Sequence, residues 1–392
     1  MFIFSDIKKL RDNICKQALL ILLFMLSLIT YLIFCFFPVY SQELLYQNKN
    51  EKINSKTVAC LLPLSGKYEL IGKKALRGIL TARNLFQPES DTQIIVKDYG
   101  DSDLELKKAI DEVVTKDNAS VVIGPLLSSS IREVSSSVKS LRVPTVVFPL
   151  SREVSLENPY IISFSYPLEK QAQVLARYAV QDIKITSLGI LYPRSDLGEL
   201  FKEAFIKGTK EFGGEIIYIG SYDPKLLDIS MEIGWINSRR PKAIFVPDAA
   251  THSGEIVLKL RQENGLEDLI LLGPNTWNSR SFLKTVAFDV NGLIFTDFFF
   301  SGSERWIDFS NKFRAAFHEE PGFFEYQVYE AASLIFHVLQ NPIQRREQIK
   351  ERILSLRDNP LFDIDQNIDG SLEISPKPLI LTINDGEIVR VK

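Results

Sequence analysis

A serine-rich loop is the first place in this sequence where residue types and spacing could bind a ligand. Ser128, Ser129 and Ser130 follow Gly124-Pro125-Leu126-Leu127, between a β-branched apolar run and a segment of helical periodicity. The first backbone N–H groups of a helix lack intrahelical partners, and together with serine hydroxyls they favour an anion. The same hydroxyls could instead cap the helix, with Ser128 or Ser129 as the capping residue. We expect one of these two roles for the loop.

Residue patterns that commonly carry catalysis or metal binding are sparse. None of the three histidines, His252, His318 and His337, lies at metal-ligand spacing from another. The sequence also lacks the Gly-x-Ser-x-Gly and Gly-x-x-x-x-Gly-Lys patterns. The run from Asp365 to Gly370 imitates half of a calcium loop, but Pro376 stands where the closing carboxylate is required. We therefore expect binding rather than catalysis, with no cofactor and no metal.

Length and composition indicate two ordinary globular domains. The 392 residues exceed one compact core, and 45% hydrophobic with 24% charged residues is typical of a folded protein. The formal net charge of -3 provides no basic field for phosphate backbones, so nucleic acid is not an expected partner.

The apolar pattern predicts an α/β fold. From residue 57, short β-branched runs alternate with segments of helical period, and a second such series follows after about residue 168. This alternation is typical of parallel, doubly wound sheets, so two similar lobes are expected. Further helices are predicted at 303–319, 323–340 and 345–356, and strands with turns in the tail.

The N-terminal segment has the features of an export signal. Its basic residues precede an uncharged stretch from 17 to 42, and the apolar part is about long enough to cross the ~30 Å hydrocarbon layer. Residues 1–41 are therefore either a signal peptide cleaved before Gln42 or a retained membrane anchor, with lipidation at Cys35 as a third alternative. Residues 42–56 are expected to form a solvated linker. All three outcomes place the remaining chain outside the cytoplasm.

Cys60 is the one cysteine beyond the N-terminal segment. It lies within the apolar run from Val58 to Leu62. No disulfide within the exported part is then possible, and a buried core residue is expected.

Several segments together resemble the type 1 periplasmic binding proteins of the leucine/isoleucine/valine-binding kind. They are VACLLPLSGKYELIGKKALRGILTA from residue 58, KDYGDSD from 97, VVIGPLLSSS from 121, VPTVVFPLS from 143, LGILYPRSDLGELFKEAF from 188 and AIFVPDAATHSGEIVLKLRQENGL from 243. The resemblance covers residues 57–392.

The resemblance implies two parallel-sheet lobes joined by a three-stranded hinge. It places the crossings between lobes near 165–169, 299–303 and 358–362. Lobe 1 would then hold residues 57–167 plus 301–360, and lobe 2 would hold 168–300 plus 361–392. The ligand is expected between the lobes, at the carboxyl ends of the strands, with hinge closure around it.

The resemblance also implies ligand-binding residues. Ser128 matches the serine that holds the ligand carboxylate in amino-acid-binding relatives, and Ser151 and Arg152 take positions of a small residue and a threonine. Arg152 would bind an anion through bidentate hydrogen bonds, or it forms a salt bridge to a nearby glutamate. Tyr68 either stacks on the ligand or is an exposed loop residue. Asn275 stands where these relatives carry the acidic residue for the ligand ammonium.

Two departures from the relatives affect the predicted ligand. Asn275 is a neutral amide, which offers no charge pairing to an ammonium, and Leu197 replaces a frequent aromatic residue. His252 could also hydrogen-bond a ligand, although an exposed position at a helix start is the favoured interpretation. A standard branched-chain amino acid is therefore not expected, and the ligand is predicted to be amino-acid-like or anionic.

These inferences predict a periplasmic or otherwise extracytoplasmic solute-binding protein for ABC import. The alternative is a non-transport regulator of envelope enzymes, similar to the penicillin-binding protein activators that share the fold. Expected partners are the small ligand and an ABC permease or a cell-wall synthase, with the N-terminal segment in contact with the membrane.

Overall fold

The computed structural model describes residues 56–83, 92–149, 158–286, 292–358, 362–366 and 370–391. The predicted signal or anchor segment, residues 1–41, and nearly all of the predicted linker lie outside these ranges. Within the described ranges, no helix is both long enough and apolar enough to span a membrane.

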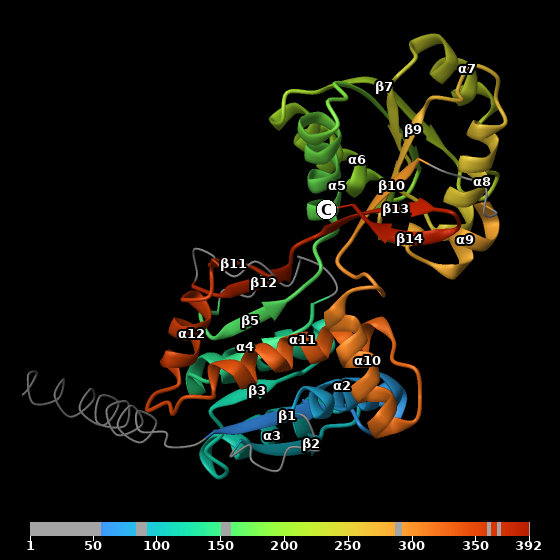
Figure 1. Cartoon of the computed structure of the whole chain (residues 1–392). Coiled ribbons are helices and arrows are strands. Elements are labelled where there is room, and N and C mark those ends of the chain that lie inside the picture. The colour runs from blue at the N-terminus through green and yellow to red at the C-terminus, as the bar shows by residue number, and fades with distance from the viewer. Residues whose placement is uncertain are drawn as a thin grey trace, which may run out of the picture.

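The chain forms two lobes, one above the other in Figure 1. The sheet of the first lobe has the strand order β11-β12-β5-β4-β3-β1-β2. Its strands are β1 (Thr57–Leu62), β2 (Gln93–Asp98), β3 (Val121–Ile123), β4 (Thr145–Val147), β5 (Ile161–Phe164), β11 (Phe362–Gln366) and β12 (Leu372–Pro376). Its helices are η1 (Gly66–Tyr68), α2 (Glu69–Ala82), α3 (Asp103–Thr115), α4 (Ser128–Leu141), α10 (Glu304–Phe317), α11 (Phe323–Val338) and α12 (Glu347–Leu354).

The second lobe repeats this plan with the strand order β14-β13-β10-β9-β8-β6-β7. Its strands are β6 (Ser187–Pro193), β7 (Glu215–Tyr222), β8 (Ala243–Phe245), β9 (Ile270–Gly273), β10 (Leu293–Asp297), β13 (Leu379–Asn384) and β14 (Glu387–Arg390). Its helices are α5 (Leu168–Arg177), η2 (Tyr178–Asp182), α6 (Asp196–Glu211), α7 (Ser230–Arg239), α8 (Ala250–Arg261), η3 (Asn275–Trp277) and α9 (Arg280–Val286).

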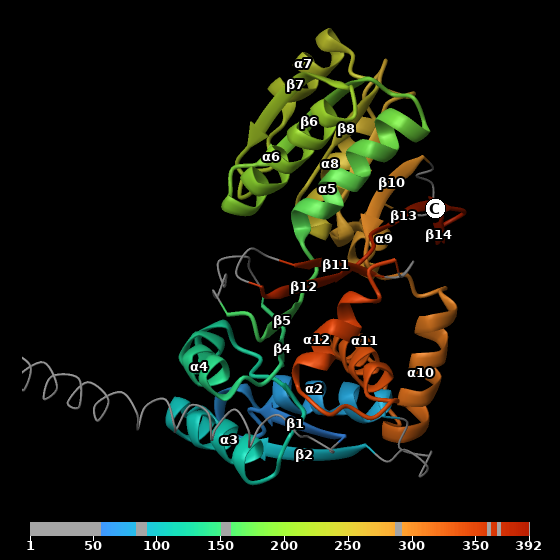
Figure 2. The ribbon, with the colours of Figure 1, turned by 90° about the vertical axis from the view of Figure 1, so that its left-hand side faces the viewer.

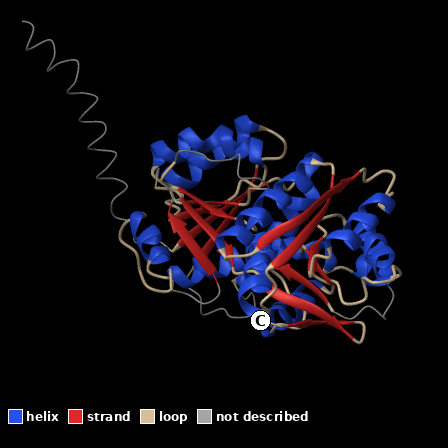
Figure 3. Cartoon of the chain, turned by 90° about the horizontal axis from the view of Figure 1, so that it is seen from above, coloured by secondary structure: helices blue, strands red, loops and turns tan. Residues whose placement is uncertain are grey.

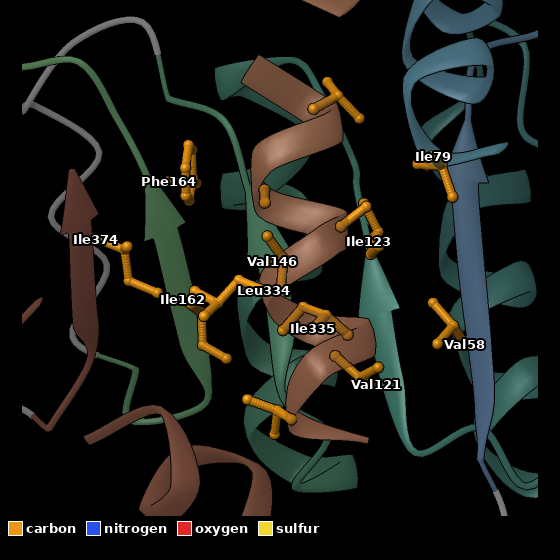
Figure 4. Packing of buried hydrophobic residues seen from close by; sticks show 14 of the residues in the cluster. Val58, Ile79, Val121, Ile123, Val146, Ile162, Phe164, Leu334, Ile335 and Ile374 are labelled. Carbon is orange, nitrogen blue, oxygen red and sulfur yellow. The ribbon is translucent and has the colours of Figure 1, made fainter. Parts of the chain in front are cut away.

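Helices cover both faces of each sheet, as Figure 3 shows from above. In the first lobe, Val58, Ile123 and Ile162 pack on one face against α2 and α11 (Figure 4). The alternate residues of the same strands, such as Ala59 and Val122, pack on the other face against α3 and α4. Central parallel strands buried on both faces are continuously apolar, which explains the runs seen in the sequence. Cys60 is fully buried among them, as predicted.

The predicted α/β architecture of two doubly wound lobes is confirmed, but the sheets are mixed. In each lobe the first five strands are parallel, whereas β11 and β13 pair antiparallel with their neighbours. The added strands come from the C-terminal tail. They form the edge of each sheet that lies next to β5 in the first lobe and next to β10 in the second lobe.

The third crossing between the lobes lies later in the chain than we expected. The expected position near 358–362 is wrong, because β11 and β12 both belong to the sheet of the first lobe. The third crossing is the short link between β12 and β13, residues 377–378. The first crossing, residues 165–167, joins β5 to α5, and the second, residues 298–303, joins β10 to α10.

Candidate ligand-binding site

The carboxyl ends of the two sheets are directed toward each other. β5 leads into the second lobe through the first crossing, and β4, β3, β1 and β2 run parallel to it. β10 leads back into the first lobe, and β9, β8, β6 and β7 run parallel to it (Figure 2). Loops at the carboxyl ends of open parallel sheets are the usual place for ligands. We call the loops after β1 and β3 and those after β8 and β9 the interlobe site.

In the first lobe, Asp98 organises the loop that follows β1. Its Oδ1 accepts hydrogen bonds of 2.8 Å from the backbone N–H groups of Leu64 and Gly100. Burial acts to raise the pKa of this carboxyl, but these bonds and that of the Ser65 hydroxyl lower it below its usual value. Asp98 therefore stays ionised and fixes the loop.

Tyr68 lies in this loop, at the end of η1, and is half-buried. The ammonium of Lys67 lies 5.1 Å from the centroid of its ring, within the range of a cation–π interaction. Asp101 also fixes the loop, because its Oδ2 accepts a 2.9 Å hydrogen bond from the backbone N–H of Lys67. The aromatic face is thus held at the carboxyl end of β1, where stacking on a ligand remains a prediction.

Ser128 and Ser129 occupy the first two positions of α4 but do not cap it. The N-cap residue is Leu127, and no side-chain hydrogen bond caps this helix. Ser128 is half-buried and Ser129 is exposed. The interpretation that Ser128 or Ser129 caps the helix is therefore wrong. Both hydroxyls lie beside the N-terminus of α4, and their binding of an anion stays a prediction.

In the second lobe, Asn275 begins the turn η3 after β9. Its backbone N–H donates a 2.9 Å hydrogen bond to Oε1 of the buried Gln171 on α5. The side-chain amide of Asn275 makes no hydrogen bond within the described residues. Because it is half-buried, it remains available to a ligand at this position.

A carboxylate that the sequence pattern did not predict lies next to Asn275. Asp248 follows β8 and accepts hydrogen bonds of 2.6 Å from the hydroxyl of Tyr222 and from the backbone N–H of Ala249. Nδ1 of His252 lies 3.2 Å from the same carboxylate, and Thr276 donates a 2.6 Å hydrogen bond to the Asp248 carbonyl. We name Asp248, Tyr222 and His252 the Asp248 group.

His252 is the most exposed side chain of the Asp248 group. The side chain of Asp248 is only 10% exposed, whereas that of His252 is 34% exposed. His252 does lie at the start of α8, as expected, but its ring is held by Asp248 and not free in solvent. In the sequence, this contact is indicated only by an aspartate four residues before a histidine at the end of a strand. That pattern alone is too common to predict a binding site.

Burial perturbs two groups near the second lobe's loops. It raises the pKa of the Tyr222 hydroxyl, and Asp248 adds to this effect. It also raises the pKa of Asp297, at the end of β10, to about 7, although Asn278 and the backbone of Phe299 oppose the shift by hydrogen bonding. Asp297 lies where the second crossing starts, and the 2.7 Å hydrogen bond that it accepts from the Asn278 amide also ties it to the loop after β9.

Two predicted site residues, Ser151 and Arg152, lie outside the described residues. The structure thus brings Asn275 and the Asp248 group together in one lobe. It places Tyr68, Ser128 and Ser129 in the facing lobe, after β1 and β3. Leu197, in the first turn of α6 after β6, is 45% exposed.

Comparison with known proteins points to one family. The family model described as "Periplasmic binding protein" matches residues 56–354 of the chain. Among solved structures, a branched-chain amino acid ABC transporter protein from Rhodospirillum rubrum has a TM-score of 0.76 at 16% identity, and the match covers 86% of this chain and 100% of that chain. The substrate-binding protein LivJ of Streptococcus pneumoniae, in complex with isoleucine, has a TM-score of 0.52 at 17% identity, with coverage of 86% and 99%.

A shorter match is to a protein of a different kind. Over 141 residues it is 31% identical to the penicillin-binding protein activator LpoA of Enterobacter sp. (strain 638), covering 33% of this chain. The match spans only 19% of the length of that protein.

Proposed function

Because the chain belongs to the periplasmic binding protein family, we propose that its lobes close over a small amino-acid-like or anionic solute outside the cytoplasm, for ABC import. The observation that carries this proposal is the unengaged amide of Asn275 beside the Asp248 group, at the carboxyl ends of β9 and β8. These polar groups converge where open α/β sheets bind ligands.

The groups of the second lobe suit the polar end of an amino-acid-like solute. Asn275 offers both donors and an acceptor, and His252 presents Nε2 because Nδ1 faces Asp248. The Asp248 carboxyl also lies close to Asn275, so the site could accept an ammonium-bearing solute, which the neutral amide of Asn275 alone did not favour. The solute carboxylate would then face Ser128 and the N-terminus of α4.

Ser151 and Arg152 remain sequence-based members of this proposed site. If Arg152 binds an anionic solute through charged hydrogen bonds, Arg152→Ala weakens binding by roughly 1.5–3 kcal/mol. An unchanged affinity would remove Arg152 from the site.

A thermal-shift screen of the exported protein tests the proposal. Amino acids, amides, dicarboxylates and peptidoglycan fragments would be added singly, because a ligand that binds only the folded state raises the melting temperature. Asn275→Ala and Ser128→Ala should each reduce the shift given by the active solute. Asn384→Ala and Ser238→Ala, at exposed positions on β13 and α7, are matched controls that should leave it unchanged.

The match to the activator LpoA favours a second candidate function, regulation of an envelope enzyme. The two functions predict different results in the same experiment. If no solute raises the melting temperature and a purified cell-wall synthase is retained on the immobilised protein, the regulatory function is supported and import is not.

A further inference from the structure

A polar depression lies at the β11 end of the first lobe's sheet, beside the start of α5. It has a volume of about 600 Å³ and is lined by Lys170, Arg357, Asp363, Ile364, Asp365 and Gln366. Lys170 comes from α5 of the second lobe, whereas the other residues belong to β11 or follow α12 in the first lobe. The depression therefore involves both lobes.

The depression runs along the outer edge of β11. Asp363 pairs with Lys170 on one face of β11, whereas Ile364 packs into the core on the other face, so lining residues from both faces meet at the strand edge. β11 is the terminal strand of its sheet, and within the described ranges no strand pairs with its outer side. Ile364 is 5% exposed and packs into the core, which fixes the strand in place.

The charged residues of the depression fall into two classes. Lys170 is ion-paired with Asp363 and lies 3.2 Å from the Ser375 hydroxyl, so these groups already satisfy each other. The side chains of Arg357 and Asp365 are exposed and make no hydrogen bond or ion pair with any described residue. One cation and one anion are thus left for a partner.

We propose that an extended segment of a protein partner adds as a strand to the edge of β11. Backbone hydrogen bonds to the strand edge supply affinity in this mode of recognition, and side chains supply specificity. The segment carries a basic residue opposite Asp365 and an acidic residue near Arg357. A small apolar ligand does not fit, because the lining is mostly charged.

A second copy of this chain is a poorer occupant than a different protein. Antiparallel pairing of two β11 strands centred on Ile364 sets Asp363 of one copy against Asp365 of the other. Pairing centred on Asp365 places Asp365 of one copy directly opposite Asp365 of the other. Like charges directly opposite each other destabilise a strand pair, so the acidic residues select for a basic partner strand.

Random dodecapeptides displayed on phage, selected on the intact exported protein, provide the probe. Selected peptides would be synthesised and their affinity measured by fluorescence anisotropy. Asp365→Lys and Arg357→Glu should each weaken binding by about tenfold or more, as loss of a charged hydrogen bond would. Replacing the basic residue of a peptide by glutamate should restore its binding to the Asp365→Lys protein.

Three readouts decide the proposal. Asp385→Lys, in the exposed turn between β13 and β14, is the control and should not change affinity. Hydrogen exchange at residues 362–366 should slow when peptide binds, because partner carbonyls then accept from the strand edge. Peptide binding that is unaffected by both reversals, unchanged exchange in β11, or a selection without a binding peptide would each overturn the proposal.

Discussion

The hydroxyl of Tyr166 donates a 2.9 Å hydrogen bond to the carboxylate of Glu330, whose side chain is only 2% exposed. Tyr166 lies in the first crossing and Glu330 on α11. Arg305, which follows the second crossing, pairs with the same carboxylate at 3.0 Å. The Tyr166 ring also packs edge-on against Phe298 of the second crossing, with 5.1 Å between the ring centroids. One buried carboxylate therefore ties both crossings to the first lobe.

Tyr166→Phe should lower the free energy of unfolding by about 1–2 kcal/mol. The substitution keeps the ring contacts but removes one hydrogen-bond donor to the buried Glu330 carboxylate. Leaving a buried acceptor without a donor costs free energy of this size. Urea unfolding followed by circular dichroism measures the difference. Tyr160→Phe is the control, because its ring is also partly buried in the first lobe but its hydroxyl has no hydrogen-bond partner among the described residues. Equal effects of the two substitutions would contradict this account of the hinge.

Asp297→Asn should change how stability depends on pH. Burial raises the pKa of Asp297 to about 7 in the folded protein, from 3.8. Between these values the folded state binds more protons than the unfolded state, so the free energy of unfolding falls as pH rises. The wild type should therefore lose roughly 2–4 kcal/mol relative to Asp297→Asn between about pH 4 and pH 8.

Urea unfolding at a series of pH values measures this difference. Glu133→Gln is a suitable control, because a hydrogen bond from Lys107 lowers the pKa of this exposed carboxyl and its contribution has the opposite sign. A constant difference between the wild type and Asp297→Asn over the whole range would show that Asp297 stays ionised in the hinge.

The architecture was largely predictable because the strands are apolar on both faces. Runs such as Val58 to Leu62 and Val121 to Ile123 are buried in full, and helical period separates them. The third crossing was not predictable in the same way. β11 and β12 are short strands with several polar residues, and only pairing with β5 assigns β12 to the first lobe.

The candidate site was predictable in position but not in composition. Ser128 and Asn275 follow strands, and strand ends can be located from the pattern. Tyr222 and Asp248 are 26 residues apart, and their 2.6 Å hydrogen bond depends on two strands with β6 between them. A contact of this kind requires the strand order, which one sequence does not supply.

Gly124→Ala should destabilise the protein and disturb the loop that presents Ser128. Gly124 has φ +101°, and an added Cβ would lie 2.1 Å from the carbonyl oxygen of Leu61 in β1. Overpacking against backbone costs about 1–3 kcal/mol in addition to the strain of the left-handed conformation. Thermal unfolding measures the loss.

Gly213→Ala separates these two costs. Gly213 also has a positive φ, +87°, but nothing lies within 4 Å of its added Cβ. The excess destabilisation of Gly124→Ala over Gly213→Ala then reports the clash with Leu61. Equal losses of stability in the two variants would mean that the backbone of β1 moves to accommodate the added Cβ.

Cys60 should be unreactive in the folded protein. Burial raises the pKa of its thiol to about 12, and the thiolate is the reactive form. Labelling with a thiol-specific disulfide reagent at about pH 8 should therefore occur only after unfolding in urea. A Ser238→Cys variant, with the thiol on the exposed surface of α7, should react at once under native conditions. Rapid labelling of Cys60 in the native state would show that the core between α2 and β1 opens.

His252→Ala and Asp248→Ala should affect stability and binding differently. His252 is 34% exposed, so its loss should change the free energy of unfolding by less than about 1 kcal/mol. Asp248→Ala leaves the buried hydroxyl of Tyr222 without its acceptor, which should cost about 1–3 kcal/mol.

With the solute that the thermal-shift screen identifies, His252→Ala should reduce affinity about two- to tenfold, the loss expected for one hydrogen bond. Calorimetric titration and urea unfolding of both variants measure the two effects. If His252→Ala binds the solute as tightly as the wild type, His252 is not a ligand contact, and Asn275 and Asp248 remain as the proposed contacts of the second lobe.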